Sequence, residues 1–258
     1  MIGPQLRTLF VCACFVVAAG ARAADAPADP VAAAIGSSER PADDRGQDAW
    51  RQPATILAFL GVKPGWHVID VFSAGGYYTE LLSRIVGANG EVIAYNNAPY
   101  EAFATKDIAA RYKGNRLPNV RQITAEVDEL TLAPASLDAA LFVMSYHDLY
   151  WKPADGTWNR TDPKTMLAKL HAALKDGGVV LVQDHVATPG GDPPAIVEKL
   201  HRIDPAVVRR DFEAAGFKFD GESAALKHEA DDHTKLVFDP AIKGKTDQII
   251  YRFRKIAR

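Results

Sequence analysis

The sequence predicts a single α/β domain with a doubly wound sheet that is mostly parallel and has an antiparallel C-terminal strand. Three observations support this class. The chain has 258 residues, of which 48% are hydrophobic and 24% charged, as in an ordinary globular domain. Short runs rich in Val, Ile and Leu alternate with longer amphipathic stretches, which is typical of βαβ units. The last two apolar runs flank a long polar segment, which favours a hairpin-like antiparallel end.

The elements follow from apolar periodicity and from the residues that begin and end them. The first helix is expected to start at Pro53 and to end at Gly61, because proline suits the first helical turn and glycine suits the end. The other predicted helices span residues 78–86, 101–112, 164–174 and 205–214. The predicted strands span residues 66–72, 91–95, 120–124, 137–144, 179–183 and 248–253, and a further strand opens at residue 217.

The N-terminal region differs in composition from the rest of the chain. Arg7 precedes an apolar run over residues 9–19, and Ala21-Arg22-Ala23 follows it. This pattern is typical of a secretory signal peptide, so we expect residues 1–23 to be cleaved and the protein to be exported, to the periplasm in a bacterium. Residues 24–51 lack sustained periodicity and are expected to form an N-terminal arm. The domain itself is expected to span residues 52–258.

Cysteine content and charge exclude several classes of function. Both cysteines, Cys12 and Cys14, lie in the predicted leader, so the mature chain would have neither a disulfide nor a catalytic thiol. Removal of the leader takes away Arg7 and Arg22 and leaves 28 basic against 32 acidic side chains, a formal charge of about −4. No basic run is present to neutralise phosphates, so we expect a small-molecule substrate and no nucleic-acid partner. After cleavage we expect no stable membrane anchor.

The most informative segment joins the first predicted strand to the next helix. The strand ends near Asp70, and the turn after it consists of small residues, Ser73-Ala74-Gly75-Gly76, followed by Tyr77. In a doubly wound sheet, ligands bind at the carboxyl ends of strands, where small residues let backbone N–H groups approach them. The alternative is a tight turn without a ligand, because glycine pairs are common in such turns.

This segment resembles the first motif of class I S-adenosylmethionine-dependent methyltransferases, in which a strand ending in Asp or Glu is followed by Gly-x-Gly. The resemblance implies a Rossmann-like fold, S-adenosylmethionine as cofactor, and cofactor contacts from Asp70 and residues 73–77. Ser73 stands in place of the first glycine of the family pattern. A nicotinamide cofactor is disfavoured, because Tyr77 and Tyr78 would crowd its pyrophosphate. The sulfonium of S-adenosylmethionine can instead rest on an aromatic face such as that of Tyr77.

Further matches follow in family order to about residue 255. Asn96 ends the second strand, where the family has an acid that binds the ribose hydroxyls, and Glu126 stands at the adenine-contacting position. Residues 174–180 and 213–217 resemble the runs before the fifth and sixth strands of the family. The chain is also similar to a group of exported, predicted methyltransferases of bacteria with a Gly-Gly-Tyr-Tyr-Thr turn and a Tyr-His-Asp stretch, whose substrate is unassigned.

Two His-Asp pairs end neighbouring strands and are candidates for the chemistry. His147 and Asp148 follow the fourth predicted strand, and Asp184 and His185 end the fifth. Methyl transfer depends mainly on in-line positioning and exclusion of water, and a base is optional. Where a proton must be removed, His147 is the first choice of base and His185 the second. Asp148 or Asp184 would orient the imidazole.

Two other interpretations of these pairs remain open. The histidines could simply bond to loop backbone. The four side chains could instead hold a divalent metal, as in methyltransferases that bind their acceptor through one. No ligand spacing is diagnostic, so the sequence assigns no metal ligand.

Two functions of different classes agree with these patterns. One is an exported methyltransferase that acts on a small or envelope-associated molecule. The other is a non-catalytic binding protein on the same scaffold. The departure of the turn from the Gly-x-Gly pattern and the uncharged Asn96 favour this second function. Glu126 and the paired His-Asp strand ends favour the enzyme.

Overall fold

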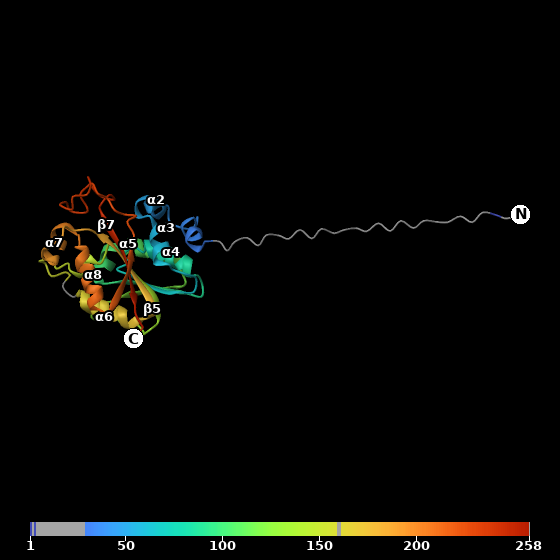
Figure 1. Ribbon diagram of the computed structural model, residues 1–258, viewed down its shortest axis with the longest axis horizontal. Helices are drawn as coiled ribbons and strands as arrows, with labels where there is room; N and C mark the ends of the chain where they lie inside the picture. The colour runs from blue at the N-terminus through green and yellow to red at the C-terminus, as the bar shows by residue number, and fades with distance from the viewer. Residues whose placement is uncertain (2, 4–28, 159–160, 258) are drawn as a thin grey trace.

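The computed structural model describes residues 1, 3, 29–158 and 161–257, and it contains a seven-stranded sheet with helices packed against it (Figure 1). The strands are β1 (His67–Val71), β2 (Glu91–Asn96), β3 (Val120–Thr124), β4 (Leu137–Val143), β5 (Leu174–His185), β6 (Phe217–Glu222) and β7 (Gln248–Lys255). The α-helices are α1 (Pro30–Ile35), α2 (Ala42–Arg51), α3 (Pro53–Leu60), α4 (Tyr77–Val86), α5 (Ala98–Tyr112), α6 (Pro163–Ala173), α7 (Pro193–Leu200) and α8 (Pro205–Ala214).

The strand order is β3-β2-β1-β4-β5-β7-β6. β1 pairs in parallel with β2 and β4, and the pairs β2–β3 and β4–β5 are also parallel. β7 lies between β5 and β6 and is antiparallel to both. The predicted fold class is therefore confirmed, including the antiparallel C-terminal strand. As a consequence, the carboxyl ends of β1, β2, β4 and β5 meet at one edge of the sheet.

Helices cover both faces of the sheet, because apolar residues of the central strands alternate between its two sides. Leu141 and Leu181 pack into a buried cluster with α3 and α4, whereas Phe142 and Val182 pack into a second cluster with α6 and α8. In Figure 1, α2, α3 and α4 lie together on one side of the molecule and α6 and α8 on the other. The central strands are thus covered on both faces, as their near-continuous apolar sequence predicts.

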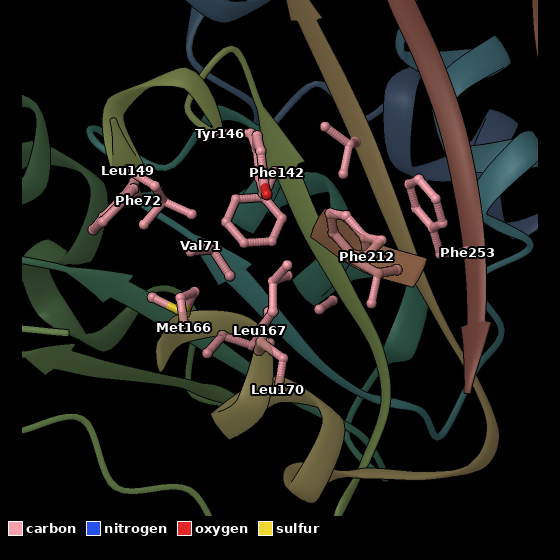
Figure 2. Packing of buried hydrophobic residues seen from close by; sticks show 14 of the residues in the cluster. Val71, Phe72, Phe142, Tyr146, Leu149, Met166, Leu167, Leu170, Phe212 and Phe253 are labelled. Atoms are coloured by element: carbon pink, nitrogen blue, oxygen red, sulfur yellow. The ribbon is translucent and has the colours of Figure 1, made fainter. Parts of the chain in front are cut away.

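Aromatic rings pack among aliphatic side chains in the core on the α6–α8 side (Figure 2). The Phe142 ring meets Tyr146 edge-on with 5.4 Å between centroids, and Phe212 of α8 stacks on Phe253 of β7 at 4.1 Å. Such pairs stabilise the fold beyond the burial of their area. They also hold the end of β4, where the first His-Asp pair follows, in a rigid frame.

Three helices lie where the sequence had indicated irregular structure. The arm forms α1 and α2, and α7 lies between the predicted strand that ends at residue 183 and the predicted helix that starts at residue 205. At α1 and α7 the local signals are an Asp cap and a proline in the first turn. Asp29 accepts from the Val31 N–H at α1, and Asp192 accepts from the Ala195 N–H at α7. Helix α1 buries Val31 in the cluster that it shares with α3 and α4, and tertiary packing thus stabilises a segment too short to be helical alone.

The predicted leader falls almost entirely on residues outside the described part of the chain, so cleavage after residue 23 stays a prediction. Within residues 29–158 and 161–257, no helix combines the length and the apolar character needed to cross a bilayer.

Candidate functional site

The turn after β1 has a left-handed backbone at alternate residues. The φ angle is 54° at Phe72, 48° at Ala74 and 79° at Gly76. Only glycine adopts such angles without a steric cost. The left-handed angles therefore fall at residues 72, 74 and 76 and not at Ser73, where the resemblance placed the first glycine of the family pattern. Phe72, a bulky residue, occupies the first of these positions.

The ring of Phe72 packs among other aromatic rings at the carboxyl end of β1. It is buried and stacks on Tyr100 with a centroid separation of 4.9 Å and an interplanar angle of 7°. Tyr95 stacks on it at 5.5 Å, and Trp158 meets it edge-on at 6.0 Å. A ligand that enters this turn must share the space with these rings or displace Phe72.

The amide of Asn96 binds the turn itself. Asn96 Oδ1 accepts from the Ala74 N–H at 2.9 Å and from Ser73 Oγ at 3.4 Å, while Asn96 Nδ2 donates to the Ala74 carbonyl at 3.3 Å. The end of β2 thereby fixes the turn after β1. Glu126, after β3, is half-buried and accepts from the N–H of Ala98, the first residue of α5, at 3.3 Å.

Helix α5 packs closely on the glycines of the turn. A Cβ added to Gly75 would lie 2.6 Å from the Cβ of Asp107, which no real side chain could tolerate. Arg111 Nε also donates to the Gly75 carbonyl at 2.8 Å. In the structure, the close approach that Gly75 permits is therefore made by α5.

Asp70 and Tyr77 lie at the start of α4. Burial raises the pKa of Asp70 to about 6, although hydrogen bonds from Thr79 act in the opposite direction. Its Oδ2 accepts from Thr79 Oγ1 at 2.6 Å, so Asp70 anchors the first turn of α4. Tyr77 Oη donates to Asp48 Oδ1 at 2.5 Å, and the Arg51 guanidinium lies 4.5 Å from the centre of its ring. The cation that lies on the Tyr77 ring in the structure is therefore the guanidinium of Arg51, the last residue of α2.

A buried ion network fastens the arm around this turn. The fully buried carboxylate of Glu80 accepts from Arg84 at 2.9 Å, from Arg111 at 2.6 Å and from Arg116 at 2.6 Å. Arg111 also bonds Asp44 of α2 at 3.0 Å. Burial alone would raise the pKa of Glu80, but hydrogen bonds from the three guanidinium groups outweigh it and hold the pKa at about 2. The network joins α2, α4 and α5.

His147 sits between two carboxylates at the end of β4. Its Nδ1 donates to Asp184 Oδ1 at 2.8 Å, and its backbone N–H donates to Asp184 Oδ2 at 2.8 Å. Its Nε2 lies 3.4 Å from Asp148 Oδ1. Burial opposes protonation, but Asp148 and Asp184 outweigh it and raise the pKa of His147 to about 9. At neutral pH this imidazole is protonated, unlike the near-neutral base expected from the sequence.

The second histidine of the predicted pairs has other partners. His185 Nδ1 lies 2.8 Å from Thr246 Oγ1, and burial lowers the pKa of His185 to about 3. Its ring centre is 6.1 Å from that of His147. The structure therefore brings both His-Asp pairs to one place, but with different protonation states at neutral pH.

His201 also belongs to this group, and the sequence analysis did not identify it. It ends α7 with a left-handed backbone, and its Nδ1 lies 3.8 Å from Asp148 Oδ1. Its ring meets that of His147 edge-on at 5.5 Å. No local spacing could have indicated it, because His201 and His147 come from separate elements of the chain.

Tyr100 connects the two halves of the site. Its ring stacks on Phe72 at the β1 turn, and its hydroxyl donates to Asp148 Oδ2 at 2.5 Å. The turn and the His-Asp cluster are therefore neighbours along one edge. Two hollows of about 330 and 350 Å³ lie elsewhere, around Glu91 and around Lys175, where strands begin. They contain none of the predicted site residues.

The comparisons with known proteins bear on the fold. No protein-family model matches the chain, and no curated protein matches its sequence. Many solved structures do match in fold. A methyltransferase of Aquifex aeolicus that depends on S-adenosylmethionine is 19% identical, with a TM-score of 0.56 over 83% of this chain and 98% of that one. The [4+2]-cyclase SpnF is 17% identical, with a TM-score of 0.56 over 82% of each chain.

A third structure contains the cofactor that the resemblance implies. Fibrillarin of Aeropyrum pernix with natively bound S-adenosyl-L-methionine is 15% identical, with a TM-score of 0.51 over 80% of this chain and 76% of that one. At these identities the likeness concerns the fold. The chain has the Rossmann-like fold found in S-adenosylmethionine-dependent methyltransferases.

Proposed function

We propose that this protein is an S-adenosylmethionine-dependent methyltransferase that acts on a small-molecule acceptor. Three segments support the proposal: the turn after β1, the Asn96-Asn97 pair after β2, and Glu126 after β3. They lie at the carboxyl edge of the sheet, where folds of this kind bind ligands. The compared methyltransferases have the same fold.

The observation that carries the proposal is a pair of buried polar atoms beside the turn. Asn97 and Tyr95 are both fully buried, and among the described residues neither Asn97 Nδ2 nor Tyr95 Oη has a hydrogen-bond partner. A buried polar group left without a partner costs about 1–3 kcal/mol. A bound adenosyl group offers ring nitrogens and ribose oxygens that would satisfy such atoms.

Positioning would then account for most of the catalysis. A methyl group is transferred in line from a sulfonium, and the rings of Tyr100 and Trp158, in contact with each other, would form an apolar wall that excludes water. We retain His147, Asp148 and His185 as the residues nearest the acceptor. His147 would have to lose its proton before it could act as a base.

A second candidate function rests on a specific observation. The Phe72 ring is packed against Tyr100 at this turn and the Asn96 amide bonds its backbone, so the turn already has partners within the protein, which favours a non-catalytic protein on the same scaffold. Fold and activity are separable, and one compared structure is named as a cyclase.

Calorimetry of the protein with S-adenosylmethionine separates the two candidates. If the protein is a methyltransferase, we expect saturable binding of one S-adenosylmethionine molecule per chain. Absence of heat at millimolar ligand, confirmed by the lack of a thermal shift, would leave only the non-catalytic function.

Asn97→Asp is expected to weaken S-adenosylmethionine binding about tenfold, because the substitution removes a donor worth roughly 1.4 kcal/mol. Aspartate can still accept from the Tyr100 N–H, so the start of α5 should be retained. Calorimetry measures the dissociation constants. Asn115→Asp makes the same charge change at an exposed residue and should leave the affinity unaltered. Equal affinities of the two variants would remove Asn97 from the site.

We also propose export, on the basis of the apolar run over residues 9–19 and the small residues after it. Cell fractionation is expected to find a form lacking residues 1–23 outside the cytoplasm, and any full-length chain, as uncleaved precursor, inside it. Retention of the full-length chain in the cytoplasm would contradict the proposal.

A further inference from the structure

Beside the turn lies a cluster of three side chains whose donor atoms face one another. They are His147 after β4, Asp148 next to it, and His201 at the end of α7, and their candidate ligand atoms all lie within 4.8 Å of one another. We propose that these three residues bind a divalent transition-metal ion of the Zn²⁺ class. The proposal is independent of S-adenosylmethionine and adds a function to the site described above.

The separations of the donor atoms fit a shared cation better than hydrogen bonds. Asp148 Oδ1 lies 3.4 Å from His147 Nε2 and 3.8 Å from His201 Nδ1. The first is long and the second too long for an N–H···O hydrogen bond. Ligand atoms on a tetrahedral ion with bonds of about 2.0–2.1 Å are roughly 3.3 Å apart. A small inward movement of His201 would therefore complete the set.

The surroundings orient two of the three ligands. Asp184 Oδ1 accepts from His147 Nδ1 at 2.8 Å, which turns Nε2 towards Asp148. A carboxylate on the outer nitrogen of a histidine is the usual support of a metal-binding imidazole. Tyr100 Oη donates to Asp148 Oδ2 at 2.5 Å and leaves Oδ1 to face both histidines.

The donor set indicates the class of ion and the kind of site. Two imidazole nitrogens and one carboxylate oxygen suit Zn²⁺, Fe²⁺ or Co²⁺ better than Mg²⁺ or Ca²⁺, which prefer oxygen ligands. Three protein ligands leave a position for water or for an oxygen of another molecule, as in catalytic rather than structural zinc sites. His201 is the least buried ligand, with 17% of its side chain exposed, so an ion could enter from that side.

Metal titration tests the inference without any methyl acceptor or cofactor. Untagged protein, stripped of metal by a chelator, is titrated with ZnCl₂ at pH 7 by calorimetry. The expected result is one Zn²⁺ per chain with micromolar or tighter affinity, and Co²⁺ in its place should give the visible absorption of a low-coordinate ion.

Variants decide whether the ion occupies this cluster. His201→Ala is expected to weaken Zn²⁺ binding more than about 100-fold, and Asp184→Asn about 10- to 100-fold. His67→Ala, at the opposite end of β1, removes a half-exposed imidazole and should leave the affinity unchanged. Circular dichroism checks that each variant folds. Failure of the native protein to bind Zn²⁺ stoichiometrically, or equal affinity in His201→Ala and His67→Ala, would overturn the proposal.

Discussion

Glu80→Gln is expected to lower the free energy of unfolding by about 3 kcal/mol, within the range measured when one partner of a buried ion pair is removed. The Glu80 carboxylate is fully buried and accepts from three arginines, and glutamine keeps its shape but not its charge. The guanidinium groups of Arg84, Arg111 and Arg116 would then repel one another. Arg84 and Arg116 are partly exposed, so water would offset some of the loss.

The same carboxylate predicts how stability depends on pH. The pKa of Glu80 is held at about 2 in the folded protein, below its usual value of 4.5. A depressed pKa means that the stabilisation is complete above about pH 4.5 and is lost as the pH falls towards 2. The native protein should therefore lose stability over this window by roughly 2–3 kcal/mol more than Glu80→Gln does.

Urea denaturation at a series of pH values measures both effects. The matched control is Glu91→Gln, because Glu91 pairs with Arg121, which is half exposed. That variant is expected to change stability by less than about 1 kcal/mol. Equal destabilisation by the two substitutions would show that the Glu80 network contributes no more than a surface pair.

Phe72→Gly is expected to tighten S-adenosylmethionine binding at least about tenfold, which corresponds to roughly 1.4 kcal/mol. The ring of Phe72 occupies the turn, so the native protein binds only in the fraction of molecules whose ring has moved aside. Glycine also suits the φ angle of 54°. Lost packing with Tyr100 should outweigh the relief of strain and lower stability by about 2 kcal/mol.

Calorimetry and thermal denaturation test this variant together. Phe219→Ala is the control, because Phe219 is a half-buried aromatic residue on β6, at the far side of the sheet. Phe219→Ala should lower the free energy of unfolding without increasing the affinity for S-adenosylmethionine. If Phe72→Gly binds S-adenosylmethionine no better than the native protein, the ring does not compete with the cofactor.

Local pattern was sufficient for most of the secondary structure. The predicted strand over residues 137–144 is observed as β4, Leu137–Val143, and the predicted strand over residues 120–124 is observed as β3. β4 is mostly apolar, whereas β3 has only two apolar residues, Val120 and Ile123, and both segments lie between turns, so neighbouring residues alone identify them. Helix α1 was missed because it depends on packing against the domain, and α2 because it depends on polar contacts such as the ion pair of Asp44 with Arg111.

The candidate site was predictable in position but not in its contacts. The sequence placed Asp70, Asn96 and His147 at strand ends, and the parallel sheet does bring those ends to one edge. It did not indicate that the Asn96 amide would bind the turn or that α5 would cover Gly75. Those contacts join residues distant in the chain, and a single sequence holds no signal for such pairs.

The sequence by itself determined the order of the strands along the chain, most of the helices between them and the antiparallel end of the sheet, and it predicted the turn at which we expect a ligand to bind. Each of these follows from spacing over a few residues, where local backbone preference and apolar periodicity decide. Only the tertiary structure decided that β7 lies between β5 and β6, that Phe72 stacks on Tyr100, and that His201 lies beside His147 and Asp148. Those outcomes depend on how distant segments pack, because burial and hydrogen bonding act between neighbours in space.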